Sequence, residues 1–205
     1  MKKLILLSLS FFMTFSFLIA QTDTTINGVN YTVFSPGLWV EVEDPEELLE
    51  IGMEYQGGII AYILQPGDPG YDSDQTHGLI AAPNDHISSI AWANNFTATG
   101  ATGTALGTGQ ANTTAIVNAH GGGSYAAKLC DDLVLGGYED WYLPSKDELN
   151  KLYENRVAVG GFAIAFYWSS SEVDTLFAWV QGFSDGFSFF EDKVSILRVR
   201  AVRAF

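Results

Sequence analysis

The chain has 205 residues, of which 24 are acidic and 10 basic, and its formal net charge at pH 7 is −14. Nucleic acids and anionic membrane surfaces repel such a chain, so the composition excludes both as partners. A single cysteine, Cys130, excludes an intramolecular disulfide. Without a disulfide, the fold depends on its core alone, and 47% hydrophobic and 14% aromatic residues supply the material for that core.

The first twenty residues have the order of a secretory signal peptide. Lys2 and Lys3 precede an uncharged, mostly apolar run that ends at Ala20, and polar residues follow. The alternative is an uncleaved membrane anchor, but the run is slightly short for the ~20 apolar residues of a span. We expect cleavage near Ala20 and a mature chain of net charge −16 without a later span. Its location is then secreted, cell-surface or periplasmic.

An acidic lead-in segment is expected over residues 21–54. Residues 30–34 are aromatic and β-branched and predict a short strand. Residues 41–50 form an acidic run, in which Asp44 followed by Pro45 is typical of a helix start. Runs of like charge are commonly solvated, so this run predicts an exposed approach to the main domain.

Residues 55–205 carry the signals of an α+β domain with two main helices and a mostly antiparallel, aromatic-rich sheet. Alternating or apolar runs predict strands at 58–63, 78–82, 167–172, 177–183, 187–190 and 197–205. Polar stretches rich in glycine predict loops at 65–75 and 94–111. Residues 113–135 are helical in composition and broken by glycines at 121–123. Ser145 and Glu148 form a predicted capping box that opens a helix ending near Glu154.

One segment has a recognisable motif. The run from Gly137 to Leu149 reads GYEDWYLPSKDEL and matches the pattern G-x-x-D-W-x-L-P-[ST]-x-x-E-L. With the runs at 56–60, 77–83, 167–172 and 198–205 and with Trp179, it resembles the Lcl C-terminal domain family over roughly residues 55–205. This bacterial family is named after a collagen-like surface adhesin. The resemblance implies a C-type-lectin-like fold.

The resemblance implies the fold more directly than it implies a ligand. The named member of the family binds sulfated, glycosaminoglycan-like polymers, whereas a mature net charge of −16 disfavours a polyanion-binding surface. The disulfides of animal C-type lectins and their Glu-Pro-Asn and Trp-Asn-Asp motifs are absent from this sequence. Calcium-dependent sugar binding of that type is therefore not carried over to this chain.

We expect a non-catalytic binding or adhesion module that recognises a carbohydrate or an extracellular protein. The alternatives are an exported enzyme with an unrecognised site and a purely structural surface protein. Binding sites concentrate on loops held by a rigid scaffold, so the connections 64–77, 94–111 and 172–177 are the candidates. The neutral hydrogen-bonding groups of the 94–111 connection suit sugar hydroxyls or a peptide backbone. The expected ligand-binding residues are Asn94, Asn95, Phe96, Thr97 and Gln110, with Arg198 and Arg200 in the closing strand.

The sequence signals for a metal site or a catalytic site are weaker than those for a binding loop. Asp68, Asp72 and Asp74 share one loop rich in glycine and proline, which could supply oxygens to Ca²⁺, the one cofactor that the sequence leaves open. The three histidines lack the spacing of metal ligands on one helix. Cys130 lies on the inward stripe of a helix and is expected to be a core thiol. No catalytic residue is predicted.

Several residues have a structural interpretation as well. The motif residues Trp141, Leu143 and Pro144 are expected to form a packed corner before the capped helix. Trp168 and Trp179 lie in apolar strands and are expected in the core. The three arginines near the end of the chain can alternatively pair with acids inside the domain, since an acidic chain offers many partners.

Overall fold

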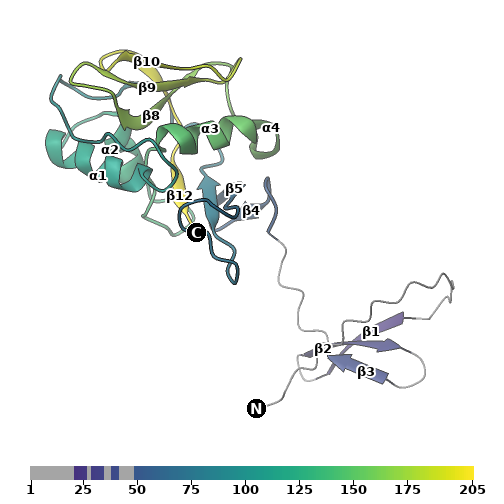
Figure 1. Ribbon diagram of the computed structural model, residues 1–205. Helices are drawn as coiled ribbons and strands as arrows, with labels where there is room; N and C mark the ends of the chain where they lie inside the picture. The colour runs from purple at the N-terminus through teal and green to yellow at the C-terminus, as the bar shows by residue number, and fades with distance from the viewer. Residues whose placement is uncertain (1–20, 27–28, 35–37, 42–48) are drawn as a thin grey trace. The chain divides into compact units, whose positions relative to one another are not determined.

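The computed structural model of the chain describes residues 21–26, 29–34, 38–41 and 49–205 (Figure 1). The chain divides into two compact units, Met1–Leu48 and Leu49–Phe205, and each is described by itself. The predicted signal peptide at 1–20 and the predicted helix start at Asp44 lie outside the described residues. Among those described, no helix has the length and apolar character to cross a membrane.

The first unit contains a small antiparallel sheet. Its strands, in the order in which they pair, are β1 (Gln21–Ile26), β2 (Val29–Phe34) and β3 (Leu38–Glu41). Thr24 pairs with Tyr31, and Val33 pairs with Trp39. The predicted strand at 30–34 is confirmed as most of β2. The strands β1 and β3 of the lead-in segment were not predicted from the sequence.

The second unit is α+β and contains two sheets. The five-stranded sheet has the order β10-β9-β8-β11-β7, and the four-stranded sheet has the order β12-β6-β5-β4. All pairs are antiparallel except β8 with β11. The strands are β4 (Glu54–Tyr55), β5 (Gly58–Ile63), β6 (Gly78–Ala81), β7 (Ile87–Ala91), β8 (Phe166–Glu172), β9 (Phe177–Gly182), β10 (Ser188–Asp192), β11 (Ile196–Val199) and β12 (Val202–Ala204).

Where two main helices were expected, the described residues hold four: α1 (Gly109–His120), α2 (Ala126–Asp131), α3 (Lys146–Glu154) and α4 (Arg156–Val159). The predicted helical segment at 113–135 contains α2 and most of α1, but α1 begins at Gly109, so the predicted loop 94–111 ends at residue 108. The break lies at the glycines, where Gly121 has a φ of 65°. Figure 1 shows α3 between the strands β8 and β9 and the strand β5, and α3 contacts all three.

The closing strand predicted at 197–205 is wrong as a single element. β11 pairs with β7 and β8 in the large sheet, whereas β12 pairs with β6 in the small one. Arg200 lies at the crossing and is fully buried. Its guanidinium donates to the carbonyl oxygens of Ala82 and Gly161. Hydrophobic patterning shows nothing of this crossing, because apolar residues occur on both sides of it.

The core confirms most of the expected interior residues. Trp141, Leu143 and Trp168 are buried, and Cys130 is fully buried. Burial raises the pKa of the Cys130 thiol well above its usual range, as expected of an inert core thiol. Trp179 is the exception among the expected core residues, because its side chain is only partly buried.

Candidate functional site

The 94–108 loop meets two turns at one end of the five-stranded sheet, and Lys193 lies at the centre of this meeting point. The N–H group of Lys193 donates to the carbonyl oxygen of Leu176 at 2.9 Å. Its carbonyl oxygen accepts from the N–H groups of Trp92 at 2.9 Å and Ala93 at 3.3 Å. We call residues 94–100, 173–176 and 193–195 the loop junction.

A buried ion pair ties the loop to the turns. Lys193 Nζ lies 2.5 Å from Glu172 Oε1, and the two side chains are 0% and 3% exposed. The Glu172 carboxylate also accepts from the N–H groups of Thr99 and Gly100, each at 2.9 Å. Burial by itself raises the pKa of Glu172, but the hydrogen bonds from Lys193 and the loop outweigh burial and lower it. The carboxylate is therefore charged at neutral pH.

His120, the last residue of α1, lies close to this ion pair. Both its ring nitrogens are buried, and within the described part of the chain neither has a hydrogen-bond partner. The ring packs edge-on against Tyr125, with 5.5 Å between the centroids. Burial, and then the positive charge of Lys193, lower the pKa of His120, and the charge of Glu172 offsets part of this. The imidazole is therefore neutral at pH 7.

The second half of the loop is held by the N-terminus of α3. The predicted capping box of Ser145 and Glu148 is confirmed. Ser145 Oγ also donates to the carbonyl oxygen of Ala105 at 2.9 Å. Glu148 Oε1 accepts from the N–H group of Gly107 at 2.9 Å. Burial raises the pKa of Glu148 despite these hydrogen bonds. Two buried glutamates from distant parts of the chain thus fix the loop at two points.

The exposed surface of the loop junction combines neutral polar groups with apolar tips. Asn94, Asn95 and Thr97 are exposed. Asn95 Oδ1 accepts from the N–H group of Thr97 at 3.0 Å and shapes a local turn. The apolar tips are Phe96, Leu176 and Val194, which are 47%, 44% and 46% exposed. The junction therefore presents a mixed surface on a fixed backbone.

The structure gathers only part of the predicted ligand-binding set. Asn94 to Thr97 lie together at the loop junction, whereas Gln110 lies in the first turn of α1. Because α1 rises 1.5 Å per residue, Gln110 is about 15 Å along the axis from His120. Gln110 is exposed, but it does not belong to the loop junction.

Arg198 and Arg200 lie elsewhere and share one acid. Asp85 Oδ2 accepts from Arg198 at 2.8 Å, and Asp85 Oδ1 accepts from Arg200 Nε at 3.0 Å. Because Arg200 is 0% exposed, its assignment to a surface site is corrected. Arg203 likewise forms two hydrogen bonds to Asp140, at 2.7 and 2.8 Å. The alternative interpretation, that these arginines pair with acids inside the domain, is confirmed.

The three aspartates predicted to bind Ca²⁺ do not converge. Asp68 Oδ2 accepts from the hydroxyl of Tyr62 at 2.6 Å and from the N–H group of Gln65 at 2.8 Å. Asp72 Oδ1 accepts from the N–H group of Asp74 at 2.9 Å. Over the described residues, no group of three His, Cys, Asp or Glu side chains is placed to hold a metal ion. The loop is shaped by its own turns.

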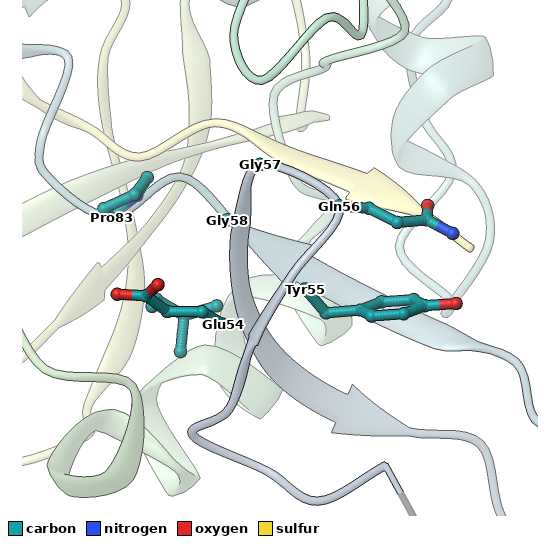
Figure 2. A pocket seen from close by; sticks show the side chains of 7 residues that line it. Glu54, Tyr55, Gln56, Gly57, Gly58 and Pro83 are labelled. Carbon is teal, nitrogen blue, oxygen red and sulfur yellow. The ribbon is translucent and has the colours of Figure 1, made fainter. Parts of the chain in front are cut away.

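Two of the hollows in the second unit are lined by residues of β4, β5 or β6. One, of about 360 Å³, surrounds the hairpin of β4 and β5. Figure 2 shows Glu54 and Pro83 on one side of this hairpin and Tyr55 and Gln56 on the other, so these side chains do not converge. Gln56 Oε1 instead accepts from Arg203.

The other hollow, of about 260 Å³, is mostly apolar, and its titratable side chains are His77 and Tyr142. His77 Nδ1 lies 3.1 Å from the carbonyl oxygen of Phe205. The hydroxyl of Tyr142 donates to Glu148 Oε1 at 3.3 Å. Both side chains thus make hydrogen bonds within the domain, and this hollow adds no residue to the loop junction.

Glu172, Lys193 and His120 were not predicted as members of the site. Lys193 lies between Asp192 and Val194 in a short turn, where a lysine ordinarily points into water. Its partner Glu172 is 21 residues away along the chain. The sequence carried no local signal for this pair, since only the fold brings the two residues together.

Comparison with curated proteins gives no match for the chain. The family model of the Lcl C-terminal domain matches residues 81–203, which is more than half of the chain. The matched region contains the whole loop junction, the capping box of α3 and the aromatic strands β8 to β10. The chain belongs to the Lcl C-terminal domain family.

Proposed function

We propose that this chain is an exported, non-catalytic binding module that contacts an extracellular protein through its loop junction. Membership of the family supports an adhesin-like domain. The observation that carries the proposal is the buried pair of Glu172 and Lys193, which fixes a loop without regular structure. The compartment is the cell surface, the surrounding medium or the periplasm.

The ion pair is better explained by positioning than by stability. A buried ion pair is often no more stabilising than apolar residues of similar volume, because removing both charges from water is costly. The Glu172 carboxylate does what an apolar side chain cannot, since it accepts from two loop N–H groups. A preformed loop loses less conformational entropy when a partner binds.

The side chains of the loop junction favour a protein partner. Phe96, Leu176 and Val194 are apolar and exposed on three separate segments, and such tips suit a surface that excludes water. Asn94 and Thr97 offer neutral hydrogen-bonding groups beside them. With a net charge of −14, a neutral or basic partner surface is favoured over an acidic one.

A C-type-lectin-like arrangement of the second unit is part of the proposal. It is supported by the α+β architecture and by long loops that surround a mostly antiparallel sheet. It is also supported by the pairing of β12 with β6, which brings a late strand beside early ones. An experimentally determined structure tests this assignment directly.

A binding screen with paired variants tests the function. The purified protein is screened against extracellular matrix proteins and glycans by biolayer interferometry. Phe96→Ala and Leu176→Ala should each weaken binding of a protein hit about tenfold or more, as expected of residues in a binding hot spot. Val157→Ala, at an 89% exposed position on α4, is the matched control and should bind normally.

Circular dichroism should show unchanged melting for all three variants. If the two junction variants bind the hit as tightly as the control, the loop junction is not the binding surface. If the hits are glycans and no protein is bound, the partner class is wrong.

A further inference from the structure

Three aromatic side chains form a strip on the outer strands of the large sheet. They are Phe177 and Trp179 on β9 and Phe190 on β10, and we call them the aromatic strip. Phe190 pairs directly with Trp179 across the strands. The ring centroids of Phe190 lie 5.4 Å from Phe177 and 6.4 Å from Trp179. Phe190 is 54% exposed, and the other two are partly exposed.

The aromatic strip lies on the face of the strands, whereas the loop junction lies at the end of the sheet, where Leu176 precedes Phe177. Successive side chains of a strand alternate between faces. Ala178 and Val180, the neighbours of Trp179, are buried in the core. Lys193 points its ammonium group to that same core side, 4.7 Å from the ring of Trp92. The three rings of the aromatic strip therefore point away from the core that contains Ala178 and Val180 and remain partly exposed.

The charges beside the strip do not favour an anion. Lys146 Nζ lies 5.2 Å from the centroid of the Trp179 ring and is also paired with Asp147 at 3.2 Å. The side chain of Asp147 is 46% exposed. Asp192 pairs with Phe177 in the strands and adds another acid at the edge of the strip. A sulfated or carboxylated ligand would meet more negative than positive charge here.

Neutral hydrogen-bonding side chains continue the strip along the same strands. Gln181 follows Trp179 on the same face of β9, and Ser188 pairs with it from β10. Ser188 Oγ lies 2.5 Å from Gln181 Oε1, and Gln181 Nε2 lies 3.4 Å from Asn150 Oδ1 on α3. Of these, Ser188 and Asn150 are partly exposed. Rings are thus followed by hydroxyl and amide groups in one line.

We propose that the aromatic strip binds a neutral saccharide chain. The apolar C–H faces of pyranose rings pack on the aromatic rings, and Asn150 and Ser188 exchange hydrogen bonds with sugar hydroxyls. Two of the rings lie on β9 and one on β10, and neighbouring strands are ~4.8 Å apart. A surface made of these three rings is small compared with the ~800 Å² that each partner buries in a stable protein–protein interface. A narrow surface of rings and neutral polar groups fits a sugar chain better than a protein.

Affinity electrophoresis of the purified protein tests the proposal. The native gels contain a neutral β-glucan, mannan, xylan or galactan, and one further gel contains heparin. At least one neutral polysaccharide should retard the protein, and heparin should not. Trp179→Ala should weaken the retarding interaction about tenfold or more, as loss of one stacked ring does for bases bound to aromatic side chains. Trp179→Phe, which keeps a ring, should recover part of the affinity.

Phe187→Ala is the matched control, because Phe187 is an exposed aromatic residue next to β10, 71% exposed, that does not belong to the aromatic strip. It should bind like the unmodified protein, and circular dichroism should show that every variant remains folded at the temperature of the gels. Retardation by heparin alone, or by no polysaccharide, overturns the proposal. So does equal binding by the Trp179→Ala and Phe187→Ala variants. Phe96→Ala should leave saccharide binding intact, which separates this proposal from the one for the loop junction.

Discussion

The loops 94–108 and 64–77 have similar compositions, rich in glycine and polar residues, yet they are held in different ways. The first is fixed by Glu172, Lys193 and Glu148, which are buried and lie on other elements. The second depends on local turns, such as those of Asp68 with Gln65 and Asp72 with Asp74. Only the first loop receives buried carboxylate anchors from distant parts of the sequence, whereas the second contacts a distant residue at its last position, where His77 Nδ1 lies 3.1 Å from the carbonyl oxygen of Phe205.

This difference concerns how firmly each loop is held before any partner binds. Local turns shape a loop but leave it free to move as a body, because few buried contacts oppose its opening. Distant buried anchors fix its backbone relative to the sheet. The comparison supports the proposal that the 94–108 loop contacts a partner, and variants of each anchor test the comparison.

The largest effect is expected at Lys193. Lys193→Ala leaves the Glu172 carboxylate buried without its cation, and removal of one partner of a buried pair costs about 3–5 kcal/mol. Urea denaturation should show a corresponding fall in the free energy of unfolding. The double variant Glu172→Gln with Lys193→Met removes both charges and should recover most of the loss. If the single variant loses less than about 1 kcal/mol, the pair does not anchor the loop.

A smaller effect is expected at the other anchor of the loop. Ser145→Ala removes the N-cap of α3 and should cost about 0.5–2 kcal/mol. It also removes the hydrogen bond to Ala105, so exchange of the amides of residues 105–108 should quicken. Thermal melts and hydrogen exchange measure the two effects. Ser145→Thr keeps the hydroxyl and is the control. An unchanged melting temperature in the alanine variant would contradict the role of the cap.

The capping box and the loop junction show how far the sequence alone could reach. The capping box was predicted because both partners lie within four residues, where spacing dictates contact. Asn94 to Thr97 were predicted from loop composition, and the structure keeps them together. Lys193 and Glu172 were not, since neither has a local signal. The split between β11 and β12 was missed for the same reason, as Arg200 meets Asp85 only after the strands pair.

The ionisation of His120 provides a finer test of the interior beside the loop junction. The pKa of His120 is lowered from 6.5 in the folded state, mainly by burial. As pH falls below 6.5, His120 therefore binds more protons in the unfolded chain than in the folded one, and this difference decreases the free energy of unfolding. Urea denaturation at about pH 7 and about pH 5 should show this loss, and His120→Phe should reduce it.

His86, whose pKa is also lowered by burial, contributes a second part of the same loss. The variant that lacks both histidines should therefore have the flattest profile. Acids with lowered pKa values, such as Glu172, lose their stabilising effect only below their ordinary value of 4.5, outside this range. An unchanged slope in the His120→Phe variant would show that the ring is accessible to protons in the folded state.

The smallest effect is expected in the 64–77 loop. The hydroxyl of Tyr62, then the N–H group of Gln65, lower the pKa of Asp68, so its carboxylate is already satisfied by hydrogen bonds. Because Asp72 and Asp74 do not join it around one point, millimolar Ca²⁺ or a chelator should leave the melting temperature unchanged. Asp68→Asn should cost about 1 kcal/mol by weakening the hydrogen bond from Tyr62. A rise in melting temperature with Ca²⁺ that is absent from Asp68→Asn would mean that the loop rearranges to bind the ion. In that case the local turns of the 64–77 loop would position a ligand site, as the distant anchors are proposed to do for the 94–108 loop.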